Sequence, residues 1–324
     1  MRQKYSIYCT LGPSTLNSNF LKFANKKKKI ISLLRLNLSH LESNKLKSSI
    51  NLIRKYTSIP ICLDTEGAQI RTRLKGKKIF LKKNASIIIS AKNSKFDLYP
   101  NYINQILKLN DILDIGFENL ILKLVKKDNK GLIFKCINPG YLETNKGVHL
   151  KNRNIKLDTL TEKDFYCIEL SKKLNIKNFA LSFTNSIKDI KKFRSLLTNH
   201  NRIYKIETLE AVKNFSKFVK IEKNFLIDRG DLSKDISIKN IPQTQRYLFK
   251  FKKRNKVEIA VATNLLESMI INPYPTRAEA NDIYNSLEMG CSRLVLAGET
   301  AVGNNPKECI NFLEDIINVY KKNK

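Results

Sequence analysis

Short apolar runs typical of β-strands alternate with amphipathic helical patterns along most of this 324-residue chain. The helical patterns have apolar residues three and four positions apart, for example at 43–56, 161–174, 276–290 and 305–322. The runs expected to be strands are 5–10, 32–37, 60–65, 179–183, 203–207, 225–228, 258–263 and 293–297. Strand and helix alternating eight times predict an α/β fold of the TIM (β/α)8 barrel type. Three of the helices are expected to have N-caps at Ser43, Thr276 and Asn305.

One segment interrupts this alternation after the third strand. It contains short strand-like runs without a long helical pattern between them, at 77–83, 86–91, 111–117, 120–128 and 131–137. Such a series predicts a small β-barrel-like domain inserted into a loop of the barrel. The expected domains are the first part of the barrel at 1–72, the inserted domain at 73–149 and the second part of the barrel at 150–324.

Composition narrows the class of protein. Apolar residues make up 42% of the chain and charged residues 27%, which is typical of a globular protein. No apolar run approaches the roughly 18 residues that span a bilayer, and the N-terminus has no cleavable signal. We therefore expect a soluble, cytoplasmic protein without a membrane partner. The scattered cysteines are expected to be reduced core residues rather than disulfides or metal ligands: Cys9, Cys62, Cys136, Cys167, Cys291 and Cys309.

The formal net charge of +31 raises the question of a nucleic-acid partner. The lysines are spread along the chain together with many Asn and Ile residues, and all three amino acids have A/T-rich codons. The chain also has no Trp, no basic aromatic motif and no helix-turn-helix pattern. We therefore attribute the charge to codon bias and do not expect nucleic acid as a partner. A positive surface would still concentrate anionic substrates.

Polar side chains gather where the expected strands end. Active sites of such barrels lie at the C-terminal ends of the strands, so these residues are expected to converge on one face. Carboxylates there would bind a divalent cation, and cationic side chains would bind phosphate. The residues in question are Arg35, Asn37, Ser39, His40, Asp64, Thr65, Arg71, Lys205, Glu207, Asp231, Thr263 and Glu299.

Lys205 and Glu207 stand two positions apart in one expected strand, so their side chains point the same way. A pair of this kind, taken alone, is more often a solvated face or a structural ion pair. Beside the other polar strand ends we interpret it as chemistry, because a buried lysine near carboxylates stays charged and can act on an anionic group. The run Arg-Gly-Asp-Leu-Ser at 229–233 further predicts a helix start whose free N–H groups bind a carboxylate or phosphate.

Ten stretches of the chain, in this order, closely resemble the pyruvate kinase family. The most specific is ATNLLESMIINPYPTRAE at 262–279. The resemblance implies a barrel with a β lid domain inserted after strand three. It also implies the glycolytic transfer of a phosphoryl group from phosphoenolpyruvate to ADP, which gives pyruvate and ATP. The matching stretches are 10–15, 35–40, 63–72, 145–150, 160–164, 180–183, 204–212, 229–233, 261–283 and 296–303.

The resemblance also implies roles for single residues. Lys205, Arg35 and Thr263 would be catalytic, and Glu207 and Asp231 would bind Mg²⁺ or Mn²⁺. The substrate-binding residues would be Lys205, Gly230, Asp231, Thr263 and Arg71. The nucleotide-binding residues would be Arg35, His40 and Lys146. The K⁺-binding residues would be Asn37, Ser39, Asp64 and Thr65.

Several positions near this chemistry depart from the family's usual residues. Asp228 stands in place of an alanine, Asn185 of an arginine, Thr208 of an asparagine and Val302 of a lysine. If Asp228 points inward, it places a carboxylate near the expected position of the substrate's own carboxylate and weakens binding. A neutral Gln69 leaves the requirement for K⁺ open.

Family members usually carry a further C-terminal domain, which holds an effector site in many of them. This chain ends at the helix after strand eight, so we expect no effector regulation. A homo-oligomer formed through the barrel is compatible with the sequence. Three functions remain under consideration. The first is a pyruvate kinase. The second is a related barrel enzyme acting on another phosphorylated or enolpyruvyl small acid. The third is a catalytically decayed basic binding protein.

Overall fold

The structure is a computed structural model that describes residues 5–90, 94–116, 119–129, 131–153 and 155–323. The chain divides into two compact units, Met1–Gly67 with Glu162–Lys324, and Ala68–Thr161. The second unit extends beyond the expected 73–149 at both ends. It does so because Ile70 on one side and Ile155 and Leu157 on the other pack into its hydrophobic core.

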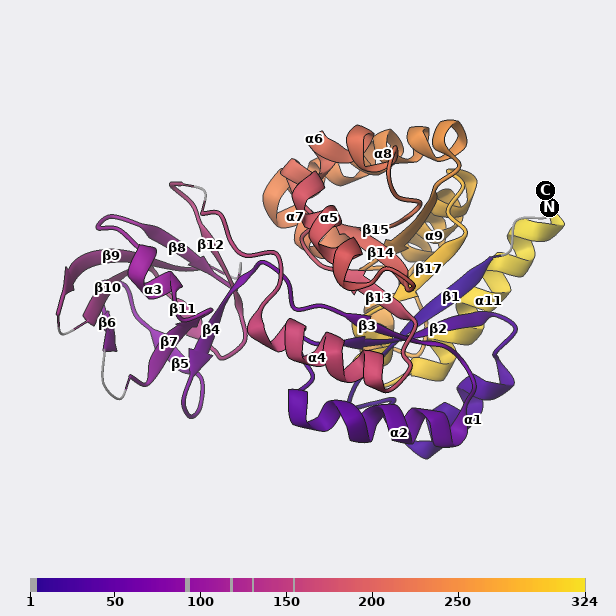
Figure 1. Ribbon diagram of the computed structural model, residues 1–324, viewed down its shortest axis with the longest axis horizontal. Helices are drawn as coiled ribbons and strands as arrows, with labels where there is room; N and C mark the ends of the chain where they lie inside the picture. Colours follow the sequence, from indigo (N-terminus) through magenta and orange to yellow (C-terminus); the bar gives the residue numbers. More distant parts are fainter. Residues whose placement is uncertain (1–4, 91–93, 117–118, 130, 154, 324) are drawn as a thin grey trace. The chain divides into compact units, whose positions relative to one another are not determined.

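Eight parallel strands close into the barrel of the first unit (Figure 1). Each strand pairs with its neighbours in the order of the chain, and the last strand pairs with the first. The barrel prediction is confirmed, with small shifts at the strand ends. The strands are β1 (Ser6–Leu11), β2 (Ile31–Asn37), β3 (Ile61–Asp64), β13 (Asn178–Leu181), β14 (Asn201–Ile206), β15 (Asn224–Asp228), β16 (Glu258–Ala262) and β17 (Arg293–Leu296).

Helices follow the strands and cover the outside of the barrel (Figure 1). All four helical patterns expected from the sequence form helices. The first pattern contains η1 and α2, and the other three correspond to α4, α9 and α11. The α-helices of this unit are α1 (Ser18–Lys26), α2 (Leu46–Tyr56), α4 (Glu162–Lys173), α5 (Ile187–Leu196), α6 (Leu209–Phe218), α7 (Arg229–Ile236), α8 (Ile241–Asn255), α9 (Arg277–Glu288), α10 (Gly298–Ala301) and α11 (Pro306–Lys322). The 3-10 turns are η1 (Ser43–Lys45), η2 (Ile238–Asn240) and η3 (Glu267–Ile270).

The three expected N-caps have different outcomes. Thr276 caps α9 and forms a reciprocal capping box with Glu279, as predicted. Asn305 precedes α11, but its side-chain amide donates to carbonyl groups of the preceding loop instead of capping the helix. The expectation for Ser43 is wrong, because η1 comes between it and α2 and places Lys45 at the cap position.

A cluster of buried apolar side chains from all eight strands lies in the barrel: Tyr8, Leu33, Cys62, Ala180, Ile203, Leu226, Ala260, Ala262 and Val295. Ile203 belongs to this cluster, and side chains two positions apart on a strand face the same way. Lys205 is therefore directed into the barrel above Ile203, toward the carboxyl ends of the strands. All six cysteines are buried and unpaired, as expected.

The second unit is built on an antiparallel sheet with strand order β6-β10-β9-β8-β12-β4-β7 and a separate pair, β11-β5. All five predicted runs contain a strand, although Ala91 and Phe117 at the ends of two runs lie outside the described residues. The sequence did not indicate β4, β7, β11 and β12, which are short. The elements are β4 (Ile70–Leu74), β5 (Ile79–Leu81), β6 (Ser86–Ser90), β7 (Phe96–Tyr99), α3 (Ile103–Ile106), β8 (Ile112–Ile115), β9 (Leu120–Asp128), β10 (Gly131–Asn138), β11 (Gly140–Leu142) and β12 (Gly147–Leu150).

Candidate active site

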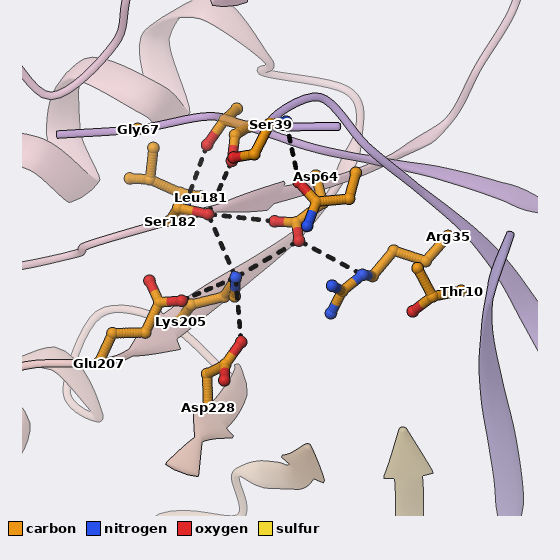
Figure 2. Close-up of polar contacts among 12 residues, drawn as sticks. Thr10, Arg35, Ser39, Asp64, Gly67, Leu181, Ser182, Lys205, Glu207 and Asp228 are labelled. Carbon is orange, nitrogen blue, oxygen red and sulfur yellow. Dashed lines mark hydrogen bonds and ion pairs between the residues drawn. The ribbon is translucent and has the colours of Figure 1, made fainter. Parts of the chain in front are cut away.

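Lys205 lies at the centre of a buried cluster of polar side chains at the carboxyl ends of the barrel strands (Figure 2). Its Nζ lies 2.7 Å from Glu207 Oε1, 3.3 Å from Asp228 Oδ2 and 3.4 Å from Asp64 Oδ2. It also donates to Ser182 Oγ at 3.3 Å. These partners stand at the ends of neighbouring strands, and Lys205 itself is only 4% exposed. One ammonium group is therefore shared by three carboxylates.

Arg35 on β2 brings a second cation to the cluster. Its guanidinium is directed toward Asp64 (Figure 2), and Nε lies 3.4 Å from Asp64 Oδ2. Arg35 is 5% exposed, yet its Nη1 atom has no hydrogen-bond partner among the described residues. A buried guanidinium nitrogen without an acceptor is costly, so its presence indicates a place for an anionic oxygen supplied by a ligand.

The cluster shifts the pKa values of its members in different directions. Burial disfavours an ammonium, but Asp64, Glu207 and Asp228 outweigh it and raise the pKa of Lys205, which stays protonated. Burial also opposes ionisation of Asp228, but Lys205, Arg35 and the Thr263 hydroxyl lower its pKa to about 2. For Glu207 burial dominates and, helped by the negative charges of Asp228 and Asp231, raises the pKa to about 8.

Three carboxylates of the cluster are arranged as cation ligands. One oxygen from each of Glu207, Asp228 and Asp231 lies within 4.8 Å of the other two. Carboxylate oxygens are the ligands that Mg²⁺ and Mn²⁺ prefer, so the donor set fits such an ion. The structure thus brings together Glu207 and Asp231, the pair predicted from the sequence, and adds Asp228 to them.

Thr263 and Gly230 adjoin this carboxylate group. Thr263 follows β16 with a φ of +74° and donates its hydroxyl to Asp228 Oδ1 at 2.5 Å. A Cβ atom on Gly230 would lie 2.8 Å from Thr263 Cγ2, so only glycine permits this approach of α7 to the loop after β16. The predicted helix start at 229–233 is confirmed, because α7 begins at Arg229.

The four residues expected to bind K⁺ lie at one corner of the barrel. Asn37 and Asp64 are register partners at the ends of β2 and β3. Asn37 Oδ1 accepts from the Ser39 amide at 2.9 Å, and Asp64 Oδ1 accepts from Ser182 Oγ at 3.3 Å. The Thr65 hydroxyl oxygen accepts from the Ser182 amide, and the Thr65 carbonyl accepts from the Ser182 hydroxyl. The residues are together, but the side-chain oxygens Asn37 Oδ1, Asp64 Oδ1 and Thr65 Oγ1 already accept protein hydrogen bonds.

Two expected site residues belong to the second unit. Arg71 on β4 pairs in register with Gly147, the neighbour of Lys146. Arg71 Nη1 donates to the Asn145 carbonyl at 3.2 Å, and Lys146 Nζ lies 3.6 Å from Glu143. Arg71 and Lys146 are therefore neighbours within that unit.

Among the remaining polar strand ends, His40 and Glu299 behave differently. His40 lies exposed in the turn after β2. Glu299 is 2% exposed and accepts the backbone amides of Leu266 and Ala297, so it stabilises the loop after β16 rather than joining the carboxylate cluster. Glu299 therefore lies apart from the carboxylates around Lys205, although it also follows a barrel strand.

Sequence reasoning missed several residues that shape the site. Ser182 bridges Lys205 and Asp64, and its only signal was a polar residue at the end of the fourth strand. Asp164 on α4 is fully buried and accepts the amides of Glu66 and Gly67, which fixes the loop after β3. Nothing in the sequence connects residues so far apart.

Two departures from the family pattern contact each other. The Thr208 hydroxyl donates to Asn185 Oδ1, and Thr208 also caps α6. The two substitutions therefore form one local hydrogen-bonded unit. Val302 is 57% exposed, and the structure offers no explanation for it.

Comparison with known proteins agrees with this geometry. Residues 2–310 match the family described as pyruvate kinase, barrel domain. Relatives named pyruvate kinase from Staphylococcus epidermidis, Staphylococcus saprophyticus and Bacillus licheniformis are each 31% identical over 97% of this chain. The chain spans about half the length of these curated relatives, 56% in each case. Across the described residues, we find no helix with the length and apolar character needed to span a membrane. The chain belongs to the pyruvate kinase family.

Proposed function

We propose that this protein catalyses phosphoryl transfer from phosphoenolpyruvate to ADP, giving pyruvate and ATP. The observation that carries the proposal is the buried, charged Lys205 among three carboxylates, next to the unpartnered Nη1 atom of Arg35. A phosphoryl group in transfer carries negative charge on its oxygens and needs positioning and charge neutralisation rather than a covalent nucleophile. Membership of the family supports the same reaction.

Each side chain of the cluster has a role that follows from its charge. Lys205 holds a positive charge where the phosphoryl group passes, and Arg35 Nη1 donates to one of its oxygens. Glu207 and Asp231 bind Mg²⁺ or Mn²⁺, and this ion supplies further charge neutralisation when bound. The amides at the start of α7, around Gly230, hold the substrate carboxylate. Thr263 lies beside the enolate that receives a proton.

The nucleotide is assigned to Arg35 and His40 of the barrel unit. Asn37, Ser39, Asp64 and Thr65 form the proposed site for K⁺. The reaction belongs to glycolysis, so the proposal also implies a cytoplasmic enzyme.

The direct test is pyruvate formation from phosphoenolpyruvate and ADP with Mg²⁺, with and without K⁺. We expect Lys205→Met to lower turnover by about 10³-fold, as for removal of a preorganised charge-stabilising group, and Glu207→Gln to lower it through loss of the cation. Lys252→Met is the matched control. That lysine is also partly buried in the barrel unit, but it bonds Glu258 and the Gly290 carbonyl away from the cluster.

A wild-type protein without pyruvate formation, or full turnover by Lys205→Met, would contradict the assignment. Stimulation by K⁺ would support the proposed K⁺ site at Asn37, Ser39, Asp64 and Thr65. Equal rates with and without K⁺ would contradict that site.

A second candidate is the same chemistry on another phosphorylated or enolpyruvyl small acid. It is favoured by one observation, the inward direction of the Asp228 carboxylate toward Lys205 (Figure 2). A negative charge there repels a substrate carboxylate placed at the start of α7. Turnover measured on a panel of phosphorylated small acids, with Asp228→Ala beside the wild type, separates the two candidates. A preference for phosphoenolpyruvate in both proteins removes the second.

A further inference from the structure

Asp228 is held in one orientation by two different partners. Its Oδ1 accepts from the Thr263 hydroxyl at 2.5 Å, and its Oδ2 lies 3.3 Å from Lys205 Nζ. A hydrogen bond from a neighbouring hydroxyl is the usual way in which a protein orients a carboxylate that ligates a metal. Oδ1 accepts from Thr263 and Oδ2 faces Lys205, so each oxygen keeps a lone pair that can bind a cation.

The carboxylates around Asp228 outnumber the buried cations. Asp64, Glu207 and Asp228 are buried beside two buried cations, Lys205 and Arg35. Asp231, which is 26% exposed, pairs with Lys234 at the rim. A bound divalent cation would supply the positive charge that lets all of the buried carboxylates ionise.

One buried atom of the same cluster shows independently that a ligand belongs there. Arg35 Nη1 has no acceptor among the described residues, although the Arg35 side chain is only 6% exposed. A buried guanidinium nitrogen without an acceptor fits an anionic group, and such a group can at the same time bind a cation held by the neighbouring carboxylates.

We propose that Asp228 is a third protein ligand of the divalent cation, together with Glu207 and Asp231. Three carboxylates would supply part of the oxygen ligands that such an ion requires, and water or substrate oxygens would supply the rest. The proposal rests on the proposed function for the identity of the cation site. It can nevertheless be tested without substrate.

The test is Mn²⁺ binding to the full chain without phosphoenolpyruvate or ADP, followed by the electron paramagnetic resonance signal of free Mn²⁺. We expect Asp228→Ala to weaken Mn²⁺ binding by about tenfold or more, because loss of a group that orients or completes a metal site typically costs at least that much affinity. Asp228→Asn keeps the size and one oxygen, so its affinity should lie between those of the wild type and Asp228→Ala. It also guards against a loss of binding caused by misfolding.

Asp235→Asn is the matched control, because Asp235 lies on the same helix α7 but accepts the Leu209 amide at 2.6 Å outside the cluster. It should bind Mn²⁺ as the wild type does. Wild-type affinity in Asp228→Ala would overturn the proposal, and so would a wild type that binds Mn²⁺ only when phosphoenolpyruvate is added. The second result would leave phosphoryl transfer itself intact, since pyruvate formation is measured with substrate present.

Discussion

Asp111 in the second unit and Glu207 in the barrel are carboxylates with equal burial, each 1% exposed, but their surroundings differ. Both oxygens of Asp111 accept from the Arg153 guanidinium, at 2.8 and 2.7 Å, and Oδ2 also accepts the Lys108 amide at 2.8 Å. Glu207 shares its one cation, Lys205, with two other carboxylates.

The difference separates structural from functional charge. Burial opposes the ionisation of Asp111, but the bonds from Arg153 and Lys108 prevail and lower its pKa. At Glu207 burial prevails and raises the pKa. A carboxylate with a complete set of partners stabilises the fold. A carboxylate left short of partners lowers stability, and such groups concentrate where a ligand completes them.

The largest effect on stability is expected for Arg153→Ala, which leaves the Asp111 carboxylate buried and unpaired. Breaking a buried ion pair costs about 3–5 kcal/mol, and we expect about 3 kcal/mol because the Arg153 side chain is 29% exposed. Hydrogen exchange in Ala68–Thr161 measures it separately from the barrel. Arg73→Ala, which removes a cation stacked on Tyr99 in the same unit, should cost about 1 kcal/mol or less. Equal effects of the two changes would contradict the view that Arg153 stabilises the fold mainly by pairing with the buried Asp111 carboxylate.

Glu207→Gln should have the opposite sign and raise the stability of the metal-free protein, by about 2 kcal/mol near pH 8. The raised pKa of Glu207 reflects what ionisation costs in the folded protein after the attraction of Lys205 is included, and a neutral glutamine avoids this cost. Glutamine can still accept the Phe183 amide that Glu207 Oε2 accepts at 2.5 Å. Denaturant unfolding in the presence of a chelator measures the difference.

The same variant has a defined pH dependence. Because the pKa of Glu207 is raised to about 8 in the folded protein, the folded state binds more protons than the unfolded state between the ordinary carboxyl value and about 8. The contribution of Glu207 to the free energy of unfolding therefore falls as pH rises through this window. The gap between Glu207→Gln and wild type should widen from pH 5 to pH 8. A difference in unfolding free energy that stays constant from pH 5 to pH 8 would contradict the raised pKa of Glu207.

The smallest effect is expected for Thr276→Ala, at the capping box of α9. The Thr276 and Glu279 side chains each accept the other residue's backbone amide. This pair therefore has complete hydrogen-bond partners, although it belongs to the barrel unit. Its loss should destabilise the protein by about 1 kcal/mol, as measured by thermal unfolding, without changing Mn²⁺ binding. A loss of Mn²⁺ binding would mean that the cluster depends on α9 and is not set by the strand ends alone.

The local patterns of the sequence were sufficient for the barrel and for part of the site. Strand and helix periodicity predicted all eight barrel strands, and the two-residue spacing of Lys205 and Glu207 predicted that both face inward. The capping box at Thr276 is equally local, since its partners are three residues apart. The strand β11 was not predicted because its three residues carry too little of the alternating pattern.

What the sequence determined by itself is therefore the set of strands, the faces of their side chains and the strand ends at which polar groups collect. Only the tertiary structure decided that Asp228 turns inward to Lys205 and Thr263, that Asp164 fixes the loop after β3, and that Asp111 meets Arg153. Each of these contacts joins residues that are distant in the chain. Backbone periodicity acts over a few residues, whereas the pairing of buried charges depends on which strand ends the closed barrel brings together.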